Sequence, residues 1–300
     1  MGNWKYSLFV LMGAICFGVL STIVKRAYAA GFTVNEVIGA QYLFGWLLLL
    51  VAFLFSSKKT LTLKQSLTLL TIGFSTSLTG IFYGISLEST PAAIAIVLLF
   101  QFTWIGIIIE AFVKKEFPTI DKWLATAIIL IGTIFASGLI GQFNWEPNSR
   151  GITFGLLAAI TFALFIYVSG HVGVGLPQVQ RSLLLITGGM LMVMYVLSPA
   201  FLFNGSIQTG LWKYGLLLGI VGTLIPVILF GIGTPKIGSG IATILGAAEL
   251  PAAVLAASFI LNEQVTPFMW LGVCLILVGI ALPRLINPYR RKELYVKGYE

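Results

Sequence analysis

Long runs without a charged residue are the feature of this sequence that most restricts its fold. Nine runs lack aspartate, glutamate, lysine and arginine altogether: 6–24, 37–57, 65–87, 89–109, 123–145, 151–180, 182–212, 214–235 and 264–283. A tenth run, 237–262, contains a single charged residue, Glu249. Most of these runs are close to the roughly 20 apolar residues that a membrane-spanning helix needs. Backbone polar groups in lipid must be satisfied within their own segment, so each run is expected to form a helix.

The composition excludes a soluble globular domain. Hydrophobic residues make up 58% of the chain and charged residues only 9%, and the mean hydropathy is +1.00. A soluble domain carries about 25% charged residues, which it needs to cover its surface. The sequence therefore predicts an all-α, multi-pass membrane protein with ten transmembrane helices, located in the inner or plasma membrane.

The distribution of basic residues predicts the orientation of the chain. With the N-terminus in the cytoplasm, the outer loops contain only Lys25, Arg26, Arg150 and Lys213, and the other 14 of the 18 basic residues face inward. The positive-inside rule then favours two cytoplasmic termini. Anionic lipid of the inner leaflet is the ordinary partner of such basic segments, so no nucleic acid partner is expected.

An internal repeat becomes visible when the sequence is shifted by 147 residues. Glu116 then falls on Glu263 and Trp123 on Trp270, and Thr119/Thr266 and Gly132/Gly279 follow the same offset. The repeat predicts two five-helix halves, 1–143 and 144–287, followed by a cytoplasmic tail, 288–300. Because five is odd, the halves must have opposite orientations in the membrane, an arrangement typical of secondary transporters.

Two stretches at this offset carry a resemblance to a known family. They are AAELPAAVLAASFILNEQVT (247–266) and FQFTWIGIIIEAFVKKEFPT (100–119). The chain resembles the drug/metabolite transporter superfamily, in its ten-helix branch with two EamA-type domains, over residues 6 to 286. It departs from the usual pattern at Leu250, where proline is common, and at Asn262, where glycine is common.

The resemblance implies a secondary active transporter with a central cavity lined by helices 1–4 and 6–9. It also implies export of a small polar or amphipathic metabolite, such as an amino acid. The motifs define a broad superfamily and do not name a substrate. A uniporter, or a carrier of drugs, nucleosides or nucleotide-sugars, remains an alternative, as does a membrane scaffold or scramblase. Monomer and homodimer are both open.

Glu249 is the leading functional candidate. A charge at the centre of the bilayer costs about 2.5–3.5 kcal/mol on insertion scales. At least twelve residues, or about 18 Å of helix, separate Glu249 from either end of its run, so its side chain cannot reach the membrane surface. It could carry protons or hold a substrate amine in a cavity. The structural alternative is a protonated side chain that hydrogen-bonds between helices.

Two prolines accompany the predicted site. Pro251 and Pro226 lack an N–H, so they are expected to free the carbonyl groups of Ala247 and Gly222 and to bend their helices. Freed carbonyls at membrane depth are tolerated where they face protein or water. The alternative is that both kinks only optimise packing.

Several polar and aromatic side chains on other predicted helices could complete a substrate or coupling site. Tyrosine and tryptophan offer an apolar face with a hydrogen-bonding tip, which suits amphipathic solutes. Core packing and interfacial belts are the alternatives for each aromatic residue. These candidates are Gln41, Tyr42, Trp46, Tyr83, Gln101, Trp104 and Thr223.

Other residues suggest more specific roles. Lys25, at the outer end of the first helix, is a gate candidate, with attachment to lipid headgroups as the alternative. Glu110 is expected to pair with Lys114 on one helix face. Small-xxx-small pairs, Gly80/Gly84 and Gly215/Gly219, are expected to mark close helix packing. His171 is expected in a loop.

Several functional classes are disfavoured. The chain has no GxxxxGK[ST] loop, so ATP hydrolysis is not expected. A single histidine excludes His-pair metal motifs, and no serine–histidine–aspartate set is available. The sequence therefore predicts neither an enzyme nor a cofactor or metal site.

Overall fold

The computed structural model describes residues 4–140 and 148–286, and all regular elements in this part of the chain are helices. The predicted domain boundary at 143/144 and the tail 288–300 lie outside the described residues. The α-helices are α1 (Trp4–Ala29), α2 (Val34–Leu54), α3 (Leu63–Ser89), α4 (Ala92–Leu99), α5 (Phe102–Lys114), α6 (Ile120–Ala136), α7 (Ser149–His171), α8 (Gln178–Leu197), α9 (Trp212–Gly219), α10 (Ile225–Ile237), α11 (Ser239–Gly246), α12 (Glu249–Leu261) and α13 (Pro267–Ile286). Shorter elements are the 3-10 helix Pro199–Leu202 and the π-helices Ile207–Leu211 and Ile220–Leu224.

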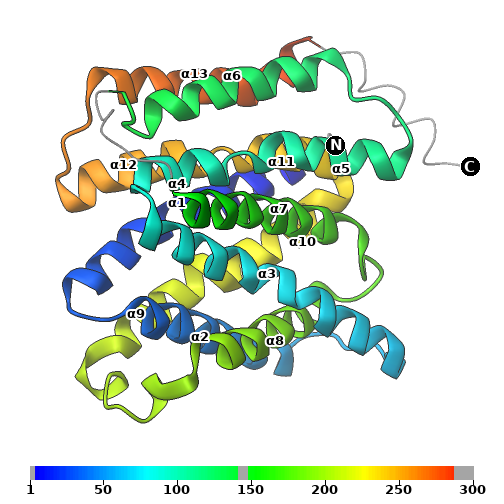
Figure 1. Ribbon diagram of the computed structural model, residues 1–300. Helices are drawn as coiled ribbons and strands as arrows, with labels where there is room; N and C mark the ends of the chain where they lie inside the picture. The colour runs from blue at the N-terminus through cyan, green and yellow to red at the C-terminus, as the bar shows by residue number, and fades with distance from the viewer. Residues whose placement is uncertain (1–3, 141–147, 287–300) are drawn as a thin grey trace, which may run out of the picture.

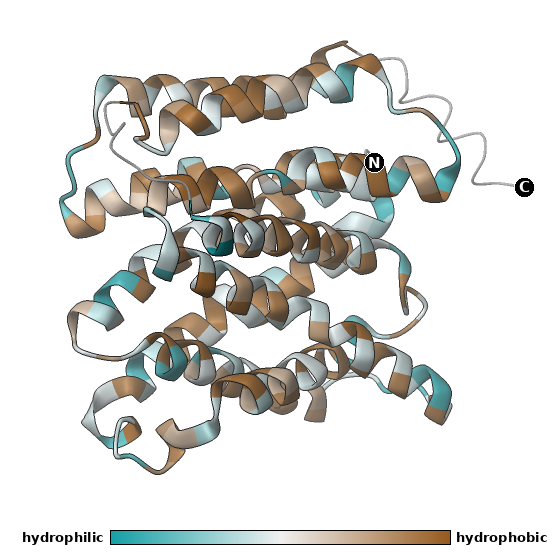
Figure 2. Ribbon diagram, viewed as in Figure 1, coloured by the Kyte–Doolittle hydropathy of each residue, from teal (hydrophilic) through white to brown (hydrophobic). Residues whose placement is uncertain are grey.

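The surface has the character expected of a chain that lies in lipid. Large apolar side chains face outward, among them Phe112 and Tyr195, which are 84% and 87% exposed. Apolar colour covers the middle of most helices, while polar colour collects at their ends (Figure 2). Within the described residues, nine helical segments are long and apolar enough to cross a membrane. The prediction of a multi-pass helical membrane protein is therefore confirmed.

The number of spans depends on α6. This helix has 17 residues and packs along the whole of α13, and the two lie together at one edge of the bundle (Figure 1). It is at the lower limit of the roughly 17–25 residues that span a bilayer. The tenth span thus stays a prediction.

Two runs that the sequence presents as single helices are each broken in the middle. In the run 237–262, α11 and α12 are separated by Ala247 and Ala248, whose N–H groups bond three residues back, to Ile244 and Leu245. The run 89–109 breaks between α4 and α5, where the N–H groups of Gln101 and Thr103 bond three residues back, to Leu98 and Phe100. A tight turn of this 3-10 type inside a helix often marks a hinge or a functional site.

The two breaks occupy corresponding positions at the offset seen in the sequence. Helices α4 and α11 begin and end 147 residues apart, and so do α5 and α12. Both α5 and α12 end at a residue in the left-handed conformation, Lys115 and Asn262, each with φ of 54°. The helix boundaries therefore follow the same repeat as the residue matches.

Helix packing interleaves the two halves of the chain. Helix α1 packs against α10, α11 and α12, while α7 packs against α3, α4 and α5. Helix α2 packs against α8 and α9, and α3 packs against α8. The first helix of each half is thus embedded among helices of the other half, and this brings residues far apart in the sequence together at the centre.

Glycines allow the closest of these contacts. A Cβ atom on Gly188 of α8 would lie 1.9 Å from the carbonyl oxygen of Leu70 in α3. The Gly215/Gly219 seam is confirmed, because a Cβ at Gly219 would lie 2.6 Å from the backbone nitrogen of Gly45. The Gly80/Gly84 seam is wrong, since no atom lies within 4 Å of a Cβ placed on Gly80.

Candidate functional site

The break between α11 and α12 places Glu249 at the first residue of α12. Its neighbours Ala248 and Leu250 are buried, but Glu249 keeps part of its surface accessible. Among the described residues, none donates a hydrogen bond to its carboxylate. Glu249 is therefore a carboxyl group deep in the protein whose hydrogen-bonding capacity is left open for something other than the protein.

Residues of the first half surround Glu249. Gly18 of α1 packs directly on its backbone, where a Cβ on the glycine would lie 2.3 Å from the Glu249 carbonyl oxygen. The hydroxyl of Tyr83 on α3 is close enough to interact electrostatically with both Glu249 and Tyr28 of α1. The structure thus brings predicted residues Glu249 and Tyr83 together and adds Tyr28, which the sequence did not single out.

Pro251 acts differently from the prediction. It is buried in the first turn of α12. The Ala247 carbonyl is not left free, because it accepts a hydrogen bond from the Leu250 N–H at 3.3 Å. The chain bends in the tight turn before Glu249, so Pro251 lies in the first turn of a new helix, where its missing N–H costs little.

At Pro226 the structure agrees more closely with the expectation that the proline frees the carbonyl group of Gly222. Pro226 lies at the start of α10, next to the π-helix Ile220–Leu224. The carbonyl oxygen of Gly222 accepts a hydrogen bond from Gln41 Nε2, at 3.5 Å. Thr223 packs on Gly45 of α2, and its hydroxyl is buried without a partner among the described residues. Gln41 and Thr223 thus lie at one contact between α2 and the π-helix Ile220–Leu224, directly before Pro226.

Tyr42 and Trp46 of α2 have partners within the protein. The Tyr42 hydroxyl donates to the carbonyl oxygen of Thr76 on α3, at 2.7 Å. The Trp46 Nε1 group donates to the Thr187 hydroxyl on α8, at 2.9 Å. Both side chains tie α2 to its neighbours, which supports the packing alternative for them.

Gln101 and Trp104 are paired at the break between α4 and α5. Gln101 Nε2 donates to the carbonyl oxygen of Val97 at 2.9 Å, and Trp104 Nε1 donates to Gln101 Oε1 at 2.8 Å. The break leaves the Val97 carbonyl without its usual partner, because the Gln101 N–H bonds Leu98 instead. Gln101 therefore stabilises the first-half break.

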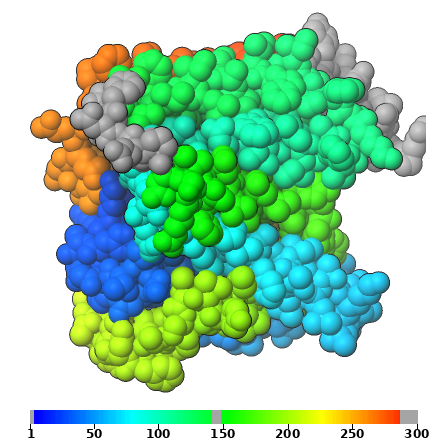
Figure 3. All heavy atoms as spheres, in the orientation of Figure 1, coloured from blue at the N-terminus to red at the C-terminus, as the bar shows by residue number. Residues whose placement is uncertain are grey.

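Lys25 forms an ion pair between the halves. Its Nζ lies 2.9 Å from Glu263 Oε1, and Arg26 donates to the carbonyl oxygen of Ile260 at 2.9 Å. These contacts join the end of α1 (blue) to the end of α12 (orange), which lie side by side at one end of the molecule (Figure 3). Lys25 and Glu263 thus lie at the same end of the bundle, and the gating role of Lys25 stays a prediction.

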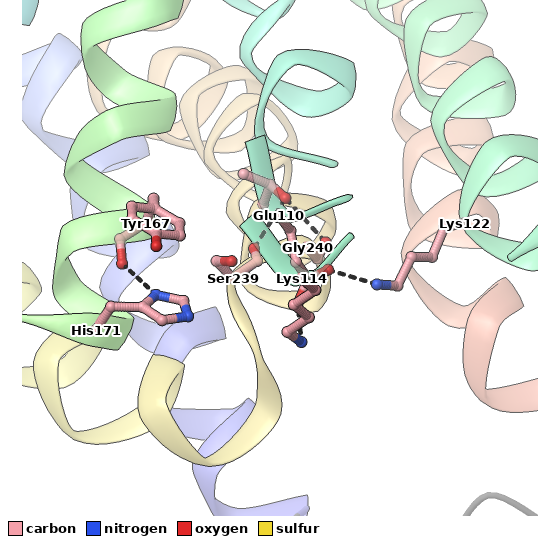
Figure 4. Close-up of polar contacts among 8 residues, drawn as sticks. Glu110, Lys114, Lys122, Tyr167, His171, Ser239 and Gly240 are labelled. Carbon is pink, nitrogen blue, oxygen red and sulfur yellow. Dashed lines mark hydrogen bonds and ion pairs between the residues drawn. The ribbon is translucent and has the colours of Figure 1, made fainter. Parts of the chain in front are cut away.

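A buried charge cluster lies at the opposite end of the bundle. Glu110, 4% exposed, accepts hydrogen bonds from Lys114 at 2.7 Å and from Lys122 at 2.5 Å (Figure 4). The expected pair with Lys114 is confirmed, and Lys122 is an addition. The carboxylate abuts Gly240 at the start of α11, which ties α5 and α6 to the second half.

His171 is not in a loop. It is the last residue of α7, its ring stacks on Tyr167 with 4.2 Å between centroids, and its Nδ1 lies 2.8 Å from the Tyr167 carbonyl oxygen (Figure 4). In residues 4–140 and 148–286, no group of three or more histidine, cysteine, aspartate or glutamate side chains is placed to hold a metal ion.

Arg181 is the main site that the sequence did not reveal. Its guanidinium is 1% exposed and forms no ion pair with a described carboxylate. Instead it donates to the carbonyl oxygens of Val168 and Ser169, at 2.8 and 2.9 Å, and of Gly231, at 3.3 Å. Pro235, four residues after Gly231, was the available signal, because it removes the N–H that this carbonyl would otherwise accept.

The geometry defines a polytopic helical membrane protein whose halves interlock around a deep, unpaired carboxyl group. The profile of the EamA-like transporter family matches the chain twice, at residues 4–138 and 149–284, and the chain belongs to this family. The resemblance to EamA-type permeases seen in the sequence is thereby confirmed.

Several relatives carry the name uncharacterized transporter. A protein of Archaeoglobus fulgidus is 26% identical over 91% of this chain and 94% of its own length. YwfM of Bacillus subtilis is 24% identical over 92% of each chain. A Synechocystis protein, sll1319, is 24% identical over 198 residues, which are 66% of this chain and 60% of that protein.

A solved crystal structure has the same fold. It superimposes with a TM-score of 0.77 over 96% of this chain and 99% of its own, at 17% sequence identity. Identity at this level supports the fold alone. The comparisons therefore establish a membrane transporter of the EamA-like family without naming what it carries.

Proposed function

We propose that this protein is a secondary active transporter that exports a small polar or amphipathic metabolite, such as an amino acid, in exchange for protons at Glu249. The observation that carries the proposal is the setting of Glu249. It is the one charged residue of the run 237–262, lies at a helix break, and has no hydrogen-bond donor among the described residues. Acidic residues within membrane spans commonly mark proton or substrate pathways.

The proposed architecture is ten spans in two inverted halves, with both termini in the cytoplasm of a plasma-membrane protein. The shared 147-residue offset of helix boundaries supports the repeat. The double match of the family profile supports it independently. The distribution of basic residues supports the orientation. Transporters built in this way bind their substrates near the midplane, where discontinuous helices meet.

Gly18, Tyr28 and Tyr83 would form the first-half side of the site, and Glu249 the second-half side. Tyrosine rings provide apolar surface, and their hydroxyls can donate or accept hydrogen bonds. An amphipathic metabolite fits this mixture better than a highly charged one does. Gln41 and Gln101 would support the site indirectly, because each holds a backbone carbonyl group at a break or kink.

Flux measurements on the purified protein in liposomes would test this function. Vesicles loaded with labelled amino acids should release them faster when the outer solution is more acidic than the interior. Glu249→Gln should abolish this dependence on the pH gradient. Glu116→Gln, which removes an exposed acid at the end of α5, is the matched control and should preserve it. Equal flux and equal gradient dependence in folded Glu249→Gln protein would refute proton coupling through Glu249.

A further inference from the structure

The helix contacts at one end of the bundle differ from the contacts that the repeat relates to them at the other end. At the end where α7 terminates, called the His171 end, α7 packs against α10 and α5 packs against α11. Under the repeat, the pair α7–α10 corresponds to α1–α3, and the pair α5–α11 corresponds to α12–α4. These counterparts belong to the opposite end of the bundle, where α1 terminates, which is called the Lys25 end. Neither counterpart pair forms an extensive interface in the part of the chain that the structure describes. Extensive helix contacts of these two kinds are therefore present at the His171 end only, within the described residues.

Close contacts seal the His171 end. A Cβ on Gly170 would lie 2.9 Å from Cγ2 of Thr234, and one on Gly106 would lie 2.2 Å from Cγ2 of Thr243. Glu110 and its two lysines press on the start of α11 (Figure 4). Shifted by 145 and 147 residues, Gly170 and Thr234 correspond to Lys25 and Leu87, which both keep exposed surface at the Lys25 end.

A cluster of six phenylalanines joins α1, α7 and α10 to the break between α4 and α5. Phe102 lies 4.7 Å from Phe162 between ring centroids, and Phe165 lies 5.7 Å from Phe230. All but Phe17 are buried, at 7% exposure or less. The phenylalanine cluster consists of Phe17, Phe100, Phe102, Phe162, Phe165 and Phe230.

The counterparts of this cluster include the residues of the candidate site. Shifted by 147 residues, Phe102 corresponds to Glu249 and Phe230 to Tyr83. The two phenylalanines are completely buried, whereas Glu249 and Tyr83 both keep accessible surface. Equivalent positions of the two halves thus hold buried apolar rings in one case and polar side chains with accessible surface in the other.

We propose that this structure is the state open to the Lys25 end, and that the phenylalanine cluster with the α7–α10 and α5–α11 contacts is its closed gate. In the alternate state these contacts separate. Helix α1 then closes on α3 and α12 closes on α4. Tyr83 and Glu249 are then joined in one packed cluster, as Phe230 and Phe102 are joined now through Phe165 and Phe162. This inference rests on the proposed transport function, since it assigns the two gates of that same site.

Paired cysteines test the exchange of the gates, in a background where Cys16 and Cys274 are replaced by serine. Gly170→Cys with Thr234→Cys should cross-link in the resting protein, and the cross-link should block transport. Lys25→Cys with Leu87→Cys should cross-link only in a minority of molecules. Phe230→Trp adds a larger ring between α7 and α10 and should hold these helices apart. In that background the cross-linked fraction of the Lys25 pair should rise at least several-fold. Efficient cross-linking of the Lys25 pair in the resting protein would overturn the assignment.

Single cysteines provide a test that does not need the close helix contact to survive. Tyr83→Cys should react with a membrane-impermeant thiol reagent from the same membrane face as Lys25→Cys, and Phe230→Cys should react from neither face. Labelling of Phe230→Cys at a rate equal to that of Tyr83→Cys would refute the closed gate. These readouts need no substrate. The expected labelling without any flux would refute the proposed function alone. Normal flux with the Gly170–Thr234 cross-link in place would refute the gate alone.

Discussion

Gln41 of α2 donates a hydrogen bond to the carbonyl oxygen of Gly222 in the second half, across 3.5 Å. Pro226, four residues after Gly222, cannot supply the N–H that this oxygen would accept in a regular helix. An amide from one half thus compensates for a proline in the other. The same device recurs at Arg181, which donates to the Gly231 carbonyl four residues before Pro235. The carbonyl groups that these two prolines leave free are therefore bonded by side chains from neighbouring helices.

Gln41→Leu is expected to lower the free energy of unfolding by about 1 kcal/mol, because it leaves a buried carbonyl without its donor. The loss should shrink in a Pro226→Ala background, where the helix can supply its own N–H, so the two substitutions should be non-additive. Unfolding in mixed detergent would measure both. Gln208→Leu, at an exposed position, is the control and should have no effect. Additive losses would show that Gln41 and Pro226 act independently.

Much of this fold is predictable from the sequence because lipid imposes simple rules. Charge-free runs mark the spans, and the offset of 147 residues matches the helix boundaries as well as the residue identities. The helix breaks before Phe102 and Glu249 were not predicted, since no glycine or proline stands at the turn residues themselves. Their positions are set by packing between the halves, which one helix's sequence does not contain.

The candidate site was predicted only in part for a related reason. Glu249 is visible in the sequence because an isolated carboxyl group in an apolar run is costly. Arg181 was missed because it lies between two charge-free runs and looks like an ordinary loop cation. Whether an arginine is buried depends on which carbonyls surround it, and here these come from α7 and α10. Tyr28 was missed because nothing in its sequence surroundings distinguishes it from an interfacial tyrosine.

Arg181→Gln is expected to destabilise the protein by at least about 2 kcal/mol, because it removes donors from several buried carbonyls at once. Arg181→Lys should recover only part of the loss, since an ammonium group cannot reproduce the planar fork of a guanidinium. Thermal unfolding of the purified variants would rank them. Arg284→Gln, an exposed change near the end of α13, should match the wild type. Wild-type stability in Arg181→Gln would mean that these hydrogen bonds contribute nothing net.

Glu110→Ala is expected to cost about 3–5 kcal/mol, the range for removing one partner of a buried ion pair, because Lys122 is only 13% exposed and would lose its counter-charge. Lys114→Ala should cost under about 1 kcal/mol, since Lys114 is 45% exposed and water can replace the contact. Chemical unfolding would separate the two variants. Equal losses for both would contradict the central position of Glu110 in the cluster.

Gly188→Ala is expected to force α3 and α8 apart, because a Cβ there would lie 1.9 Å from a backbone oxygen that cannot move by rotating a side chain. A marked loss of folded protein should follow, with fluorescence-detected chromatography as the measurement. Gly80→Ala on α3 is the matched control. Nothing lies within 4 Å of its added methyl group, so it should be neutral or stabilising by up to about 1 kcal/mol. A similar loss in both variants would show that helix flexibility, and not close approach, explains these glycines.

Lys25→Ala tests whether the ion pair with Glu263 acts as a gate or only as a structural contact between α1 and α12. Both side chains are about half exposed, so the pair should contribute less than about 1 kcal/mol to stability. Helices α1 and α12 pack together, as do their counterparts α7 and α5, so both interfaces are expected to persist through the cycle. Lys25→Ala should therefore leave the turnover rate in liposomes within about twofold of the wild type, and so should the charge-exchanged Lys25→Glu/Glu263→Lys protein. A large change in rate with unchanged stability, restored by the charge exchange, would instead identify the pair as a gate.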